Sequence, residues 1–188
     1  MTIVEYNSKW TEYFQQIENI LKSNLSKYAK IEHIGSTAIT GMWAKPIIDI
    51  VIVINSPEDF IETKNELEKI GYSHHGDQGI IGREVFKRNI NFQNEILDNI
   101  SHHLYVCTID NEEYKRHTLF RNYLNKHEKA RNEYNNIKKE IIHKIGNEDR
   151  KEYVSIKATQ YNWFFEKVLK EANEEEKLIL GKYQSKTI

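Results

Sequence analysis

One carboxylate inside the most apolar run of the chain constrains the fold more than any other feature. Residues 47–54 read Ile-Ile-Asp-Ile-Val-Ile-Val-Ile, a run with the length and β-branched composition of a buried strand. Moving the carboxylate of Asp49 out of water costs several kcal/mol unless a cation, hydrogen bonds or solvent compensate it. Asp49 is therefore either paired with a basic residue such as Lys45 or Arg83, or placed in a cleft as a metal-binding or catalytic group.

A small-residue turn precedes this strand. Residues 31–34 form a short strand-like segment that runs into Gly35-Ser36-Thr37. In an ordinary turn, glycine supplies unusual dihedral angles and the hydroxyls bond the local backbone. Exposed amides and hydroxyls are also suitable donors to an anion such as phosphate. Because the turn and the strand are close in sequence, we expect Ser36, Thr37 and Asp49 to converge on one pocket.

These two segments resemble the nucleotidyltransferase superfamily, and more specifically the GrpB family. The GrpB core reads His-hydrophobic-Gly-Ser-Thr and then Lys-Pro-hydrophobic-hydrophobic-Asp, which matches residues 33–37 and 45–49. Further matching segments follow in the family's order over roughly residues 5 to 170: Gly82-Arg83, Phe86-Lys87-Arg88, residues 102–106, Arg116-His117, residues 120–124, Tyr153 and Lys157. The resemblance therefore rests on several segments and covers most of the chain.

The resemblance implies a set of site residues. It places a nucleotide phosphate at Gly35, Ser36 and Thr37, and gives Asp49 and His103 catalytic or metal-binding roles. It adds basic phosphate-binding candidates, which are Arg83, Arg88, Arg121 and Lys157. Basic side chains beside apolar stripes either extend to water or line an anion pocket. We expect Arg121 and Lys157 to reach the same cleft as Asp49, although they lie far along the chain.

The expected metal content is small. Residues 49 and 51 share one strand face, and Val51 occupies the position where an active nucleotidyltransferase presents its second acid. Mg²⁺ is commonly held by one or two carboxylates together with phosphates and water. We therefore expect at most one Mg²⁺, held by Asp49 with His103. Two bound ions would need a second carboxylate, such as Glu84 or Glu32.

The histidines leave alternatives open. His102 and His103 are adjacent in a predicted strand and so face opposite sides of the sheet. The family pattern here is close to His-Leu-His-Val, and Tyr105 replaces its second histidine. His33 either joins the site or is a structural residue. His74 and His75 lie in the glycine-rich segment 73–82, for which we expect a loop with solvated side chains.

The hydrophobic pattern predicts an α+β protein, in which a mixed sheet of four or five strands is flanked by helices and the C-terminal half is helical. Besides the two strands above, we expect strands at 84–90 and 101–109, and helices at 10–28, 57–70, 110–126, 128–145 and from near Asn147 to Val168. Residues 1–172 are expected to form a single domain of nucleotidyltransferase type, and residues 173–188 a polar tail.

Composition limits the partners. With 27 basic and 28 acidic residues the net charge is −1, which argues against broad attraction to nucleic acids or membranes. The N-terminus lacks a signal-peptide pattern and residues 47–54 are too short to span a bilayer, so we expect a cytoplasmic protein. The single cysteine, Cys107, excludes an internal disulfide and is expected to be buried.

Two functions remain open. The first is an enzyme that binds a nucleoside triphosphate, holds one Mg²⁺ with Asp49, and transfers a nucleotidyl group to an unknown acceptor. The second is a catalytically degenerate module that binds a nucleotide or a phosphorylated metabolite, or that supports a partner protein. The resemblance names a candidate partner, because some GrpB-like proteins are fused to dephospho-CoA kinase.

Overall fold

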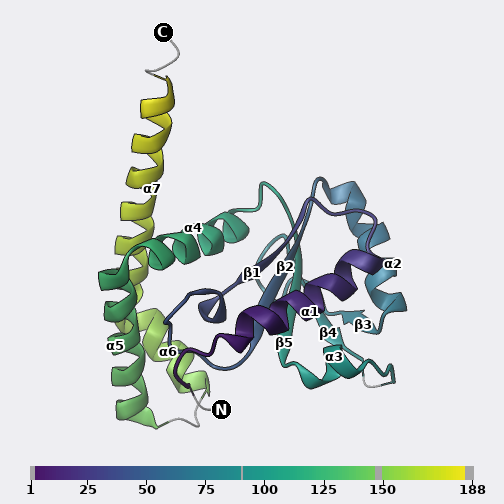
Figure 1. Ribbon diagram of the computed structural model, residues 1–188, viewed down its shortest axis with the longest axis horizontal. Coiled ribbons are helices and arrows are strands. Elements are labelled where there is room, and N and C mark those ends of the chain that lie inside the picture. The colour runs from purple at the N-terminus through teal and green to yellow at the C-terminus, as the bar shows by residue number, and fades with distance from the viewer. Residues whose placement is uncertain (1–2, 90, 147–149, 185–188) are drawn as a thin grey trace.

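A five-stranded mixed sheet forms the N-terminal half of the protein (Figure 1). The computed structural model describes residues 3–89, 91–146 and 150–184. The strands are β1 (Lys30–Ile34), β2 (Ile48–Ile54), β3 (Tyr72–His74), β4 (Arg83–Arg88) and β5 (His102–Thr108), in the order β1-β2-β5-β4-β3. Strands β2 and β5 are parallel, and the other neighbours are antiparallel.

Helices cover the sheet and make up the C-terminal half. They are α1 (Lys9–Asn24), α2 (Phe60–Lys69), α3 (Glu95–Asn99), α4 (Glu112–Lys126), α5 (Glu128–Ile145), α6 (Arg150–Gln160) and α7 (Asn162–Gln184), with 3₁₀ turns η1 (Ser36–Ala38) and η2 (Pro57–Asp59). Helix α1 crosses the sheet, whereas α4 to α7 gather to one side of it (Figure 1). The expected α+β class, with a mixed sheet and a helical C-terminal half, is confirmed.

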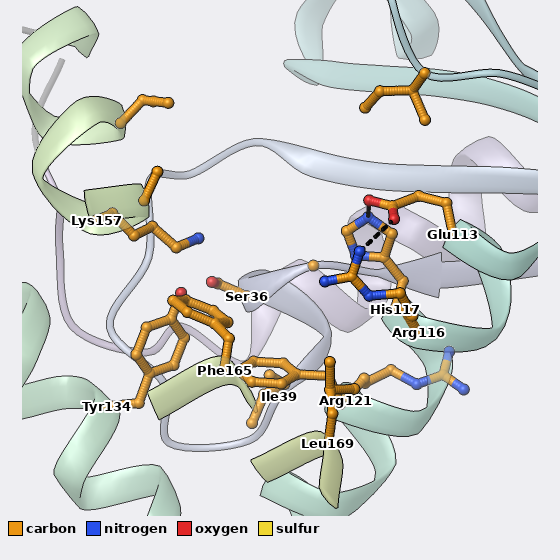
Figure 2. A pocket seen from close by; sticks show the side chains of 15 residues that line it. Ser36, Ile39, Glu113, Arg116, His117, Arg121, Tyr134, Lys157, Phe165 and Leu169 are labelled. Carbon is orange, nitrogen blue, oxygen red and sulfur yellow. Dashed lines mark hydrogen bonds and ion pairs between the residues drawn. The ribbon is translucent and has the colours of Figure 1, made fainter. Parts of the chain in front are cut away.

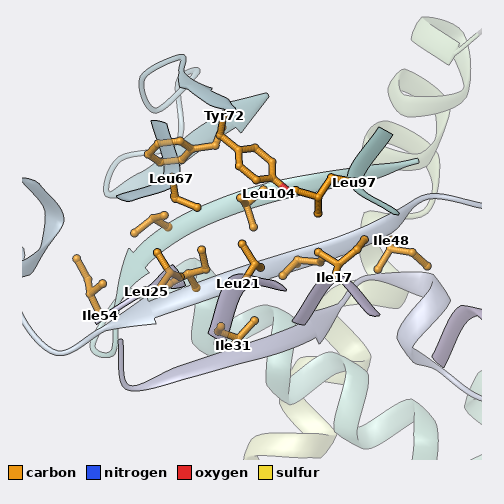
Figure 3. Packing of buried hydrophobic residues seen from close by; sticks show 14 of the residues in the cluster. Ile17, Leu21, Leu25, Ile31, Ile48, Ile54, Leu67, Tyr72, Leu97 and Leu104 are labelled. Carbon is orange, nitrogen blue, oxygen red and sulfur yellow. The ribbon is translucent and has the colours of Figure 1, made fainter. Parts of the chain in front are cut away.

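The alternation of β2 separates the core from the polar face. Ile48, Ile50, Ile52 and Ile54 point to one side, where they pack with Ile17 and Leu21 of α1 and with Leu104 of β5 (Figure 3). Full burial of each isoleucine contributes about 1.5–3 kcal/mol. A one-residue slip would turn all four isoleucines to the other face. This register therefore fixes Asp49 on the opposite face, next to Ile34 of β1 and His103 of β5.

A second apolar core joins the helical half to the segment between β1 and β2. Ile39 and Met42 of that segment pack against helices α4, α5 and α7, through residues that include Leu124, Ile137 and Phe164. Asn135 of α5 adds two backbone hydrogen bonds, because its amide nitrogen donates to the Gly41 carbonyl (2.9 Å) and its oxygen accepts from the Trp43 amide (2.8 Å). The helical half is thus anchored to the loop that follows the small-residue turn.

Two local expectations are corrected. Part of segment 73–82 pairs with β4 as strand β3, and His74 is not solvated: its Nε2 lies 2.6 Å from Glu84 Oε2 and its ring packs on Phe86. The last predicted helix is broken at Tyr161, which is 8% exposed in the helical core and accepts a hydrogen bond from the Phe164 amide (3.0 Å). This break lets α6 pack on α5 and α7 on α4.

The C-terminal segment is more regular than its composition indicates. Helix α7 continues to Gln184, so residues 173–184 of the predicted tail are helical, and this end of α7 projects beyond the helical half (Figure 1). Residues 185–188, the predicted helix start near Asn147 and position 90 of the predicted strand 84–90 lie outside the described residues.

Arg121 connects α4 to the edge of the sheet. Its Nη1 donates to the His33 carbonyl (2.7 Å) and lies 2.8 Å from Glu32 Oε2, while the Tyr114 hydroxyl donates to Glu32 Oε1 (2.9 Å). The side chains of Arg121 and Glu32 are 18% and 20% exposed. The pair is therefore shielded from much of the solvent, and we infer that it stabilises the fold.

We predict that Arg121→Met lowers the free energy of unfolding by about 2 kcal/mol, because Glu32 loses its shortest ion pair and the His33 carbonyl loses a charged donor. Arg116→Met is the matched control, since Arg116 is 61% exposed in an ion pair within one helix and such pairs contribute about 0–1 kcal/mol. Urea unfolding measures both. Equal, small losses in the two variants would show that the Arg121 contacts do not stabilise the protein.

Candidate functional site

Asp49 and His103 form a hydrogen-bonded pair on the polar face of the sheet. The His103 Nδ1 atom lies 2.8 Å from Asp49 Oδ1, and the side chains of Asp49 and His103 are 29% and 37% exposed. The carboxylate thus has an imidazole as its partner, and no ion pair between Asp49 and Arg83 is found among the described residues. Since Nδ1 is held by the carboxylate, Nε2 is the ring atom left to contact a ligand.

The turn before β2 lies directly against this pair. Gly35 has a φ of +72°, which L side chains rarely adopt, and a Cβ built at this position would overlap Asp49 Oδ2. Glycine is therefore required for two reasons, the dihedral angle and the close approach. Ser36, Thr37, Asp49 and His103 line one cavity of about 430 Å³, so the expected convergence of turn and strand is present.

Thr37 serves the fold within this turn. Its hydroxyl donates to the Ile47 carbonyl (3.1 Å) and lies 2.8 Å from Nε2 of His33. Thr37 is 3% exposed, and both of these contacts are internal. Burial lowers the pKa of His33 to about 4, Asp49 raises it and Arg121 lowers it, so His33 is a neutral structural residue near pH 7.

Lys138 of α5 is the site residue that the sequence reasoning missed. It is 2% exposed, and its Nζ donates to Ser36 Oγ (2.7 Å) and to the Trp43 carbonyl (2.6 Å). Burial lowers its pKa well below the usual range, and Lys157 lowers it further. Its position four residues after Tyr134 and three before Ile141 puts it on the buried face of the predicted helix, a signal that could have identified it.

A larger cavity adjoins Ser36 on the helical side. It measures about 550 Å³ and shares Ser36, Tyr134, Val154 and Lys157 with the first cavity. Aromatic rings form its wall, with Phe120 stacked on Phe165 at a centroid distance of 5.2 Å. The Lys157 ammonium lies 4.7 Å from the Phe165 centroid and points toward Ser36, whereas the guanidinium of Arg121 points away from both (Figure 2). We refer to the two cavities together as the cleft.

The two arginines of β4 lie on opposite faces of the sheet. Arg83 shares the face of Asp49, lines the 430 Å³ cavity and lies 4.5 Å from the Tyr105 ring centroid. Arg88 lies on the face of the isoleucine core and contacts Asp98 (2.9 Å) and the carbonyls of Ile70 (2.6 Å) and Gly71 (2.9 Å). Side chains alternate between the two faces along a strand. Arg83 and Arg88 are five residues apart, so Arg83 faces the cleft and Arg88 faces away from it.

Asp49 and His103 are the candidate metal ligands in the cleft. No group of three His, Cys, Asp or Glu residues that could hold a metal occurs in the described part of the chain. Val51 is 2% exposed in an apolar cluster, Glu84 contacts His74 on the other face, and Glu32 is held by Arg121 and Tyr114. A two-metal clamp beside Asp49 therefore lacks its second acid among the described residues. Glu113 also lines the cleft but is paired with Arg116 and His117, so Asp49 is the carboxylate better placed to meet a cation carried in by a ligand.

No helix among residues 3–89, 91–146 and 150–184 is both long and apolar enough to cross a membrane.

Cys107 is 3% exposed, as expected, and burial raises the pKa of its thiol to about 12. A thiol with so high a pKa is a poor nucleophile near pH 7.

The fold and the Gly-Ser-Thr turn beside Asp49 place the protein in a family. The model of the GrpB protein family matches residues 1–171, so the chain belongs to that family. It is 32% identical to the glutamate-rich protein GrpB of Alkalihalophilus pseudofirmus over 149 residues, 78% of this chain and 84% of that protein. It is also 36% identical over 140 residues to the UPF0157 protein YqkA of Bacillus subtilis, but the match spans 74% of this chain and 39% of YqkA.

The architecture is shared with a solved member of the family. The crystal structure of the conserved protein GrpB from Enterococcus faecalis superposes with a TM-score of 0.75 at 30% sequence identity. The match covers 93% of this chain and 98% of that chain. The sheet and the helical half are therefore both part of the family's fold.

We predict that His33 makes stability depend on pH. Between about pH 4 and pH 6.5 the unfolded chain binds a proton at His33 that the folded chain does not. The free energy of unfolding should therefore fall by up to about 3 kcal/mol as the pH drops through this window. Urea unfolding at a series of pH values from about 4 to 8 gives the free energy of unfolding as a function of pH. This free energy should change less with pH in His33→Gln than in the wild type, and His75→Gln is the exposed control. The same pH dependence in all three proteins would contradict the prediction.

We predict that Gly35→Ala is more costly than Gly76→Ala. Both glycines have positive φ angles, +72° and +68°, but a Cβ at Gly76 meets nothing within 4 Å. Gly76→Ala should therefore lose only about 1 kcal/mol to backbone strain. Gly35→Ala must also displace the Asp49 carboxylate, so its loss should be about 1–2 kcal/mol larger. Thermal or urea unfolding compares the two, and equal losses would show that the contact with Asp49 is unimportant.

Proposed function

We propose that the cleft binds a nucleotide or another phosphorylated small molecule. The observation that carries the proposal is a pair of cations beside the Gly-Ser-Thr turn. Lys138 and Lys157 line the cleft, and no ion pair with an acid is found for either within the described residues. Burial and the nearby Lys157 disfavour the charged form of Lys138, whereas Lys157 is half-buried. An anion bound between the two lysines would favour the charged form of both and would therefore bind favourably. A phosphate near Ser36 has the right charge and oxygen geometry.

The helical side of the cleft suits the rest of a nucleotide. The cavity beyond Ser36 is lined by Phe120, Tyr134 and Phe165, with Arg116 and His117 at its rim. Stacking of a base on an aromatic side chain contributes about 1–3 kcal/mol in nucleic-acid complexes. We therefore place the phosphates at Ser36, Lys138 and Lys157, and the nucleoside or other apolar part against the aromatic wall.

The Asp49–His103 pair favours nucleotidyl transfer as a second candidate function. Asp49 fixes the orientation and tautomer of the imidazole, and His103 Nε2 can then accept a proton from an acceptor hydroxyl. Lys138 and Lys157 would neutralise charge on the transferred phosphate. A Mg²⁺ ion carried by the phosphates would add charge neutralisation and would meet Asp49 as its carboxylate ligand. Val51, in place of a second acid, favours the simpler role of binding without transfer.

Lys138 provides the sharpest test of binding. At 100 times its dissociation constant, a ligand adds about 2.7 kcal/mol of stability, which corresponds to a rise in melting temperature of roughly 5 to 11 °C. We expect such a shift with ATP, GTP, CTP or UTP for the wild-type protein, and its loss in Lys138→Met. Lys139→Met is the matched control on the same helix, because Lys139 is exposed and lies over the Trp43 ring. An unchanged shift in Lys138→Met would contradict the proposal.

The same samples separate binding from transfer. Nucleotide stabilisation should persist in EDTA, because the lysines belong to the protein, and Mg²⁺ should strengthen it in the wild type but not in Asp49→Asn. Release of pyrophosphate that is lost in His103→Gln would support transfer, whereas binding without turnover would support the binding module. For the latter role we propose a cytoplasmic location and a partner such as a CoA-pathway kinase, to be tested by co-purification with that kinase.

A further inference from the structure

A second groove continues from the cleft past Arg83 and Lys87 on the polar face of β4 and reaches Arg88 and Leu97 at the edge of the isoleucine core. It has a volume of about 1000 Å³ and shares Ile47, Arg83, His103 and Tyr105 with the cleft. We propose that this groove binds a second small molecule, one that carries a phosphate or carboxylate group held by Arg83. The inference deepens the proposed function and rests on it in one respect, since it makes this molecule the acceptor beside a bound nucleotide.

Arg83 has the properties of a ligand-binding arginine. Its guanidinium lies 4.5 Å from the Tyr105 ring centroid, which restrains the plane of the group. Its Nε is buried and has no hydrogen-bond partner, and no ion pair of Arg83 is present in the part of the chain that the structure describes. A buried donor without a partner destabilises the protein. An anion bound by the planar guanidinium would satisfy it.

The charge of the groove favours an anion. Lys87 lies two residues from Val85 and four from Arg83 on the same strand face, and it is exposed where the groove meets solvent. Asp98 is the acid among the lining residues, and Arg88 already pairs with it at 2.9 Å. Glu113 of α4 lies near enough to feel the charge of Arg83, but it is paired with Arg116 and His117. Among the residues that line the groove, Arg83 and Lys87 are therefore not matched by a second acid.

The loop over the groove supplies an unusual polar residue. Gln78 lines the groove with a φ of +50°, and it is the non-glycine residue with positive φ among the described residues. Such a conformation is strained and persists because the surrounding structure imposes it. The amide of Gln78 adds a donor and an acceptor for hydroxyl or phosphate oxygens.

His103 defines where the second molecule would react. His103 lines both the groove and the 430 Å³ cavity of the cleft. A molecule anchored at Arg83 in the groove can therefore present a hydroxyl to Nε2 of His103. In the transfer reaction that hydroxyl oxygen forms a bond to the α-phosphorus of the nucleotide, its proton moves to His103 Nε2, and the bond from phosphorus to pyrophosphate breaks. The acceptor class is therefore a small hydroxyl compound with a phosphate or carboxylate group.

Glycerol 3-phosphate is the probe for this groove, because it carries both groups. We expect its titration into the full chain, followed by NMR, to give saturable shifts at Gln78, Tyr105 and the Arg83 Nε–H. Arg83→Gln should weaken this binding at least tenfold, Arg83→Lys should retain part of it, and Lys64→Gln on α2 should leave it unchanged. If the spectrum of unliganded Arg83→Gln shows that the fold is disturbed, the test rests on Arg83→Lys. Weaker binding by Arg83→Lys than by the wild type supports the proposal, and equal binding contradicts it.

The positions of the shifts distinguish the two proposals. Shifts confined to Ser36 and Lys138, no shifts, or groove shifts that Arg83→Gln does not weaken would overturn the groove proposal. Groove shifts that depend on Arg83 support it, even if nucleotides fail to stabilise the protein and the proposed nucleotide site is wrong. If inorganic phosphate alone gives the same groove shifts, the anion contact at Arg83 is supported.

Discussion

The cleft depends on the hydrogen bonds that the Lys138 side chain donates. This side chain reaches from α5 to Ser36 and to the Trp43 carbonyl, and so connects the helical half to two points in the segment between β1 and β2. Hydrogen bonds from a charged donor contribute about 1.5–3 kcal/mol, but desolvation of the ammonium opposes them and lowers its pKa. The position is thus held by geometry, and since burial disfavours the charged form, an anion bound beside Lys138 would favour the ammonium and be held by it.

The sheet contributes the other half of the site through strand parity. The same alternation that buries four isoleucines of β2 places Asp49 on the opposite face, where β5 presents His103 in register. Gly35 then allows the turn to approach the carboxylate without a Cβ between them. Because these contacts follow from the core register, the pair and the turn are positioned before any ligand arrives.

Family membership and site chemistry answer different questions. The chain belongs to the GrpB family and has its fold, but a fold hosts many activities and the reaction depends on the residues in the site. Here the cations outnumber the acids in the cleft, and the position for a second metal-binding carboxylate holds the buried Val51. The proposals therefore rely on lysine, arginine and histidine rather than on a metal centre.

Several features were determined by the sequence itself. The Ile-rich run predicted a buried strand, and the helical periodicity of residues 110–145 predicted the helical half and so the α+β class. The short spacing between the Gly-Ser-Thr turn and Asp49 predicted that turn and carboxylate converge. These features depend on local spacing and on burial periodicity, which the sequence contains. The resemblance carried by motifs along the chain also identified the family, which the match over residues 1–171 confirms.

Only the tertiary structure decided which polar groups are already used by the fold. Thr37, Arg88 and Arg121 match the family pattern, yet their polar atoms contact internal partners in the fold. Lys138 carries no motif, but helix packing brings it to Ser36. The physical reason is that a side chain's partners are set by tertiary contacts, which join residues 88 apart for Arg121 and His33 and 102 apart for Lys138 and Ser36. Periodicity and local propensity do not encode such contacts.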